Sequence, residues 1–167
     1  PPPPPPPPAI QRAAAACRHT SPAFWRRYVV FATRQLKDRK LGLSVCERAS
    51  RNCPWDKSLV VARLQSLERA GAGLDVLAAV ARSAVEEALV KDRASCLEVL
   101  RAYCDSCRRR LAAAIDDAAT TSELLVNLIA WTRDAFVYSI GFMEKRHSEW
   151  FDGLLTLHRY RTVVEEE

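Results

Sequence analysis

The strongest constraint on the fold is a small residue that returns at one place in a repeated helical pattern. Glu47-Arg48-Ala49-Ser50 is followed by a similar Glu86-Glu87-Ala88-Leu89 and, more loosely, by Arg133-Asp134-Ala135-Phe136. A period of about 35 to 50 residues with one small residue at a fixed point is typical of a helical solenoid. The repeat therefore predicts an all-α fold built from stacked helix hairpins.

Large apolar residues precede each small residue at helical spacing. The segments Trp25-Arg26-Arg27-Tyr28, Val60-Val61-Ala62-Arg63 and Leu100-Arg101-Ala102-Tyr103 occupy one register. A large residue on the forward helix needs a small residue opposite it on the returning helix, because otherwise the two backbones cannot approach. We therefore expect one set of residues to hold the repeats together: Trp25, Tyr28, Phe31, Ala49, Pro54, Ala88, Tyr103 and Ala135.

Caps and helix breakers predict where the helices begin and end. Ser21-Pro22 is typical of a helix start, Pro54 of a helix end, and Asp56 of an N-cap. Gly71 and Gly73 then follow a helix end. We expect helices over residues 21–37, 41–51, 57–70, 74–90, 95–114 and 123–145, the last capped by Thr121 or Ser122, and a further helix pair that starts in 147–167.

The sequence predicts a proline-rich tail followed by a helical domain. Residues 1–20 open with Pro1–Pro8, which favours polyproline II, and continue with a short helix over 9–17; we expect this tail to be partly disordered. Residues 21–167 form a helical domain of about three to four hairpins. The chain begins without Met and its helical pattern runs to Glu167, so we expect a fragment of a longer array.

Composition favours a helical interaction module over an enzyme or a membrane protein. The chain has 167 residues, 49% of them hydrophobic, only five Gly, and no stretch of 18 uncharged apolar residues. Six Cys in such a chain are expected to be reduced thiols, and Cys104-x2-Cys107 lacks the second pair that a zinc site needs. Without a Gly-rich phosphate loop, a nucleophile elbow or a His-x3-His box, we expect no catalytic, metal or cofactor site and no small-molecule substrate.

The net charge of +5 is unevenly distributed. Residues 1–70 hold 13 Lys and Arg against 4 Asp and Glu, a net +9, whereas residues 71–167 hold 12 against 16, a net −4. The basic half could attract RNA or an acidic protein, and the alternative is a solvated helix face. The candidate surface comprises Arg26, Arg27, Lys37, Arg39, Lys40, Arg108, Arg109 and Arg110.

Two parts of that candidate surface differ in how well they can form a patch. Arg108, Arg109 and Arg110 are consecutive on a helix and so point in three directions. Lys37, Arg39 and Lys40 lie in a predicted hairpin turn, which makes them the better candidates for one electrostatic surface. Aromatic residues could also stack on bases, but their helical spacing beside Leu and Val favours core positions: Trp25, Tyr28, Tyr103, Trp131 and Trp150.

The chain resembles the half-a-TPR (HAT) repeat family, whose pattern is Trp-x2-Tyr on the first helix and Glu-Arg-Ala before a Pro on the second. More narrowly, it resembles the N-terminal HAT domain of the U4/U6 small nuclear RNP recycling factor family over about residues 21–165. Segments 51–55, 97–105 and 132–136 carry that closer match. The chain departs from the pattern where Val60 and Leu100 replace Trp, Arg63 replaces Tyr, and Ala32 replaces Glu.

The resemblance implies a right-handed α-α superhelix that acts as a protein-binding scaffold in nuclear RNA processing, above all in pre-mRNA splicing and U4/U6 assembly and recycling. It implies partners among the proteins of an RNA-processing particle, a second copy of the domain as a further candidate, and only indirect or weak contact with RNA. One alternative is a HAT subunit of another machine, such as a 3′-end cleavage or U1-associated factor. Another is a direct RNA-binding module that uses the basic N-terminal half.

Overall fold

The computed structural model describes residues 21–35, 38–87, 89–117 and 119–146. The described chain is helical and contains no strand, which confirms the all-α prediction. Its elements are α2 (Pro22–Val30), the π-helix η1 (Phe31–Gln35), α3 (Arg39–Asn52), α4 (Lys57–Arg69), α5 (Leu74–Glu86), α6 (Arg93–Asp116) and α7 (Ser122–Arg146). Pro1–Pro8, the expected helix over 9–17, Lys37, Ala88 and residues 147–167 lie outside the described residues.

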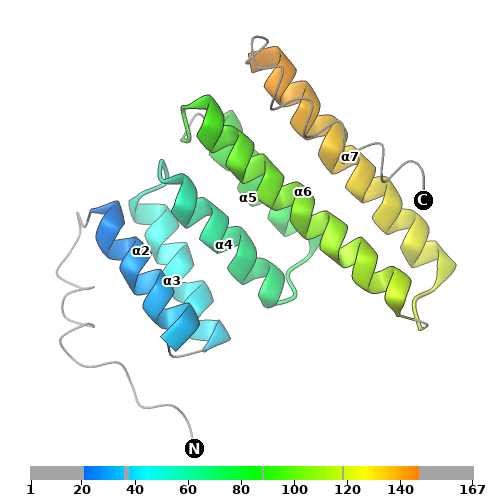
Figure 1. Ribbon diagram of the computed structural model, residues 1–167, viewed down its shortest axis with the longest axis horizontal. Coiled ribbons are helices and arrows are strands. Elements are labelled where there is room, and N and C mark those ends of the chain that lie inside the picture. Colours follow the sequence, from blue (N-terminus) through cyan, green and yellow to red (C-terminus); the bar gives the residue numbers. More distant parts are fainter. Residues whose placement is uncertain (1–20, 36–37, 88, 118, 147–167) are drawn as a thin grey trace, which may run out of the picture.

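The helices follow one another as antiparallel hairpins placed side by side along the long axis of the molecule (Figure 1). The three forward helices, α2, α4 and α6, begin at Pro22, Lys57 and Arg93, which are 35 and 36 residues apart. α4 packs against both α2 and α6, so forward helices contact their neighbours in the next hairpin. This is the arrangement of a helical repeat; the right-handed sense of the superhelix stays a prediction.

Local signals place most helix boundaries. The side chain of Asp56 accepts the N–H of Leu59 at 3.2 Å and caps α4, as predicted. Thr121 caps α7 by accepting the N–H of Leu124 at 3.3 Å, which decides between the two predicted caps. Gly71 follows α4 with a φ of 77°, the left-handed conformation that glycine adopts without a Cβ penalty. Asp38 and Asp92 are caps that the sequence prediction missed.

Two helix ends differ from the prediction. The first helix was expected to run regularly to Lys37, but after Val30 it widens into a π-turn, where the hydroxyl of Thr33 donates to the carbonyl of Val29 at 2.7 Å. The fifth helix was expected to reach Val90, but it ends at Glu86 and the N–H of Val90 instead donates to the carbonyl of Ala84. The buried small residues of α5 are Ala78, Ala81 and Ala84, and the packing role predicted for Ala88 stays a prediction.

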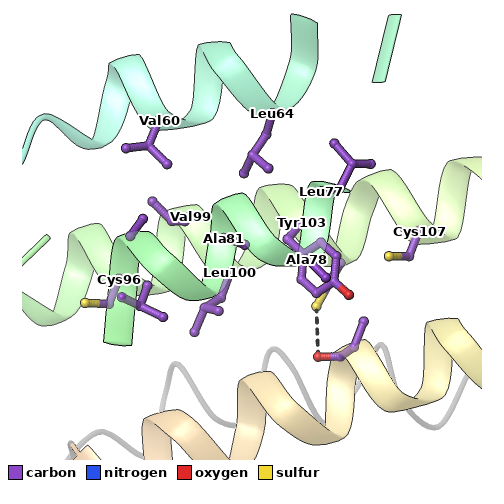
Figure 2. Close-up of a cluster of buried hydrophobic side chains, with 14 of the residues drawn as sticks. Val60, Leu64, Leu77, Ala78, Ala81, Cys96, Val99, Leu100, Tyr103 and Cys107 are labelled. Carbon is purple, nitrogen blue, oxygen red and sulfur yellow. Dashed lines mark hydrogen bonds between the residues drawn. The ribbon is translucent and has the colours of Figure 1, made fainter. Parts of the chain in front are cut away.

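Two apolar cores hold the hairpins together. The first joins α2 to α3 and the start of α4, and contains Trp25 (1% exposed), Tyr28 and Ala49 (0%). The second lies where α4, α5, α6 and α7 meet and contains Tyr103, Ala135 and Phe136. Figure 2 shows its side chains converging from α4, α5 and α6. Phe31 is half-buried at the edge of the first core, and Pro54 is half-buried just after α3.

Two polar pairs inside the cores join neighbouring helices. The Sγ atom of Cys46 on α3 lies 3.3 Å from the Oγ atom of Ser66 on α4. The Sγ atom of Cys104 on α6 lies 3.4 Å from the Oγ atom of Ser139 on α7. The hydroxyl of Ser139 also donates to the carbonyl of Ala135 at 2.8 Å, so it is satisfied within α7 and contacts α6 as well.

Candidate protein-interaction surface

The forward helices are linked on their solvent side by three ion pairs. Arg26 on α2 pairs with Asp56 at 3.1 Å, Lys57 on α4 pairs with Glu98 on α6, and Arg109 on α6 pairs with Glu68 on α4. The last pair is bidentate, with both N···O distances at 2.8 Å. Each exposed pair is expected to contribute little stability alone. Together they join α2 to α4 and α4 to α6 across the outer faces of these helices.

A groove runs between α4 and α6 on this surface. It has a volume of about 260 Å³ and is lined by Val61 and Ala102 on its apolar side and by Gln65, Glu98, Arg101, Asp105 and Arg109 on its polar side. Arg101 is exposed and makes no ion pair with another described residue, whereas Glu98 and Arg109 already have partners. The groove thus offers one available cation among paired charges, which suits a peptide with an acidic side chain.

The predicted arginine triplet is divided between different contacts. Arg109 lines the groove and holds Glu68, Arg110 donates to the carbonyl of Ala72 after α4, and Arg108 lies 3.9 Å from Asp105. The three side chains diverge, as consecutive positions on a helix must. Arg109 and Arg110 therefore join α6 to α4, and only the outer part of each guanidinium can meet a partner.

The predicted basic residues of the first hairpin that the structure describes lie on α2 and in the first turn of α3. Arg26 pairs with Asp56, Arg27 is exposed on α2, and Arg39 and Lys40 are exposed in the first turn of α3. Arg39 also lines a small hollow with Arg69, a residue that the sequence analysis did not single out. Their role in binding stays a prediction.

The aromatic residues divide between core and surface. Trp25, Tyr28 and Tyr103 are buried, as their spacing predicted. The core prediction for Trp131 was wrong, because its side chain is 38% exposed and lies at the edge of α7, where its Nε1–H donates to the hydroxyl of Tyr103 at 3.2 Å. Trp150 lies outside the described residues. Trp55 is 59% exposed in the turn before α4, so hairpin packing does not require it.

The paired cysteines of α6 are core residues in this structure. Cys104 and Cys107 are both buried, and burial raises the pKa of each thiol to about 12. Such thiols stay protonated at neutral pH, whereas the thiolate is the nucleophile and the metal ligand. No group of three or more His, Cys, Asp or Glu suited to a metal ion occurs among residues 21–146 as far as the structure describes them.

Glu68 makes the ion-pair link between α4 and α6 sensitive to acid. The two hydrogen bonds from Arg109 lower the pKa of the Glu68 carboxyl, and the hydroxyl of Ser106 adds to this at 3.0 Å. A lowered pKa means that the ionised form stabilises the folded state above the ordinary pKa of 4.5, and that this contribution is lost as the pH falls through the folded-state value.

Glu68→Gln is therefore expected to destabilise the protein by up to about 1 kcal/mol at pH 7, because one partner of a partly exposed pair is removed. The difference from wild type should shrink as the pH falls below 4.5, and urea denaturation between pH 3 and pH 7 measures it. A difference that stays constant over this range would show that the charge of Glu68 contributes nothing.

Comparison with known proteins finds similarity over most of the chain. The chain is 31% identical over 131 residues to the spliceosome associated factor 3, U4/U6 recycling protein, of Homo sapiens, and 33% identical over 144 residues to the protein of the same name in Danio rerio. These alignments cover 78% and 86% of the chain. The chain is a homologue of these U4/U6 recycling proteins. The resemblance predicted from the sequence is thus confirmed.

The homology concerns a small part of each relative. The chain spans about 13% of the Homo sapiens protein and 15% of the Danio rerio protein. A Mus musculus protein of the same name is 33% identical over 77% of the chain. No protein-family model matches the chain. Among the described residues, none of the helices has the length and apolar character needed to cross a membrane.

Proposed function

We propose that this chain is a protein-binding scaffold in the nucleus that serves pre-mRNA splicing through the assembly and recycling of U4/U6 particles. The observation that carries this proposal is the homology over most of the chain to proteins named as U4/U6 recycling factors. The described residues fit a scaffold, since ion pairs join the forward helices and a groove lies between α4 and α6 on their outer side.

The groove between α4 and α6 is the part of this surface that we assign to a protein partner. Val61 and Ala102 provide an apolar side, and Arg101 provides a charge that no described residue neutralises. A partner segment with an apolar residue and a nearby carboxylate complements both features. The surrounding ion pairs keep the groove ordered before the partner arrives, which reduces the entropy lost on binding.

Affinity purification from nuclear extract tests the proposal. The tagged chain is expected to recover proteins of the U4/U6 particle, and Arg101→Glu should reduce that recovery at least tenfold because it reverses the charge in the groove. Lys91→Glu is the matched control, since Lys91 is exposed in the turn before α6 and outside the groove. Equal recovery by both variants would exclude the groove, and absence of U4/U6 proteins from the wild-type sample would exclude the function.

The same purification separates the alternatives. Recovery of 3′-end cleavage or U1 proteins in place of U4/U6 proteins would assign the chain to another RNA-processing machine. Direct RNA binding is a second candidate because Arg27, Arg39 and Lys40 are exposed and make no ion pair with described residues. Recovery that disappears after RNase treatment and falls steeply with salt would support that reading, since phosphate contacts release counterions.

A further inference from the structure

Arg63 occupies a place in the repeat where the other two forward helices carry tyrosine. Tyr28 and Tyr103 are buried at the equivalent positions of α2 and α6. The phenol of Tyr103 is satisfied there, because it accepts a hydrogen bond from Trp131. Arg63 places a guanidinium into the same kind of inter-helix space, and neither the packing of the repeat nor the groove between α4 and α6 accounts for it.

The side chain lies in a crevice where α3, α4 and α5 come together. Pro54, Val60, Val80 and Ala84 form apolar walls, and Ser50 and Ser83 add two hydroxyls. The Nε atom of Arg63 is buried and has no hydrogen-bond acceptor among the described residues. The guanidinium makes no ion pair with a described residue either.

The buried Nε–H of Arg63 is unfavourable unless something accepts a hydrogen bond from it. A donor that leaves water without gaining an acceptor loses a hydrogen bond, and the loss is larger when the donor is part of a charged group. The crevice has a volume of about 40 Å³, open to solvent on one side. One water needs roughly 10–15 Å³ of such space, so the crevice has room for a group of three or four atoms.

We propose that the Arg63 crevice binds a carboxylate, supplied by an acidic side chain or the C-terminus of a protein partner. A carboxylate matches the planar guanidinium, and its aliphatic stem suits the apolar walls. A phosphate is less well matched, because the crevice offers it a single cation and Ser83 already donates to Glu87 at 2.9 Å. The origin of the carboxylate in a partner rests on the proposed scaffold function, whereas carboxylate binding itself does not.

The test follows the Nε–H resonance of Arg63 by ¹H–¹⁵N NMR while sodium acetate replaces sodium chloride at constant ionic strength. A saturable shift of the Arg63 signal, with little change at the exposed Arg101, is the expected result. An unchanged Arg63 signal, or equal shifts at all arginines, would overturn the proposal and leave water as the occupant. A stronger response to sodium phosphate than to acetate would overturn the choice of carboxylate.

Variants separate binding from folding. Arg63→Tyr restores the residue of the other two repeats and is expected to fold, but acetate should no longer raise its melting temperature relative to chloride. Arg101→Gln is the control and should keep the full acetate effect. Glu87→Gln tests the internal rival: if it alone shifts the Arg63 signal and acetate does not, Glu87 is the partner of Arg63 and the proposal fails. None of these measurements depends on U4/U6 proteins, so the proposed function can fail separately.

Discussion

Replacing Trp25 with alanine is expected to lower the free energy of unfolding by about 3–5 kcal/mol, because a large buried side chain is lost and a cavity remains. Trp25 is 1% exposed and packs against the rings of Phe24 and Tyr28 at centroid distances of 6.0 and 6.2 Å. Its indole N–H is buried without an acceptor among the described residues, so its contribution comes from packing. Guanidinium denaturation followed by circular dichroism measures the change.

Trp55→Ala is the matched control for this experiment. Trp55 is 59% exposed, and its loss should change stability by less than about 0.5 kcal/mol, as is usual for surface substitutions. Trp25→Phe should lose less than Trp25→Ala, because it keeps an aromatic ring and removes the unpaired N–H. Similar losses for Trp25→Ala and Trp55→Ala would contradict the assignment of Trp25 to the core of the first hairpin.

Replacing Ala49 with tryptophan is the second large effect that we expect. Ala49 is 0% exposed on α3 and shares its core with Trp25 and Val45, so a second indole has no space there. Overpacking of this kind costs about 1–3 kcal/mol or more, because backbones and rotamers must shift. Thermal denaturation measures the loss.

Ala79→Trp provides the control for Ala49→Trp, because Ala79 is an exposed position on α5. The control variant should stay close to wild type in stability. If Ala49→Trp also stays close to wild type, the small-residue contact between the two helices of the first hairpin does not exist as described. Ala135, 1% exposed on α7, allows the same test in the third hairpin.

Several features that depend on neighbouring residues could be predicted from the sequence, although the equally local caps Asp38 and Asp92 were missed. Asp56, Thr121 and Gly71 act within four residues of the helix ends that they set. The π-turn after Val30 and the early end of α5 at Glu86 are accompanied by hydrogen bonds, from Thr33 to Val29 and from Val90 to Ala84, that a periodic apolar pattern does not reveal. Helical spacing therefore predicted a longer first α-helix and a longer α5 than the structure has.

The surface was harder to predict than the core. Arg26 pairs with Asp56 and Arg109 with Glu68, partners that lie 30 and 41 residues away in the sequence, so the sequence alone presented these arginines as available charges. Arg101 is exposed and makes no ion pair with a described residue, but in the sequence it stood out only for its place in the aligned repeats. Trp131 follows the apolar spacing of α7 but is 38% exposed, and its indole N–H donates to the phenol of Tyr103.

The buried cysteines can report which part of the protein unfolds first. Cys46 and Cys53 belong to the first hairpin, and Cys96, Cys104 and Cys107 lie along α6 in the third; all five are buried. A thiol reagent reaches such a side chain only when its part of the chain opens, and stacked repeats open from their ends. The order in which the five positions are alkylated therefore shows which end of the array opens first, without any added probe.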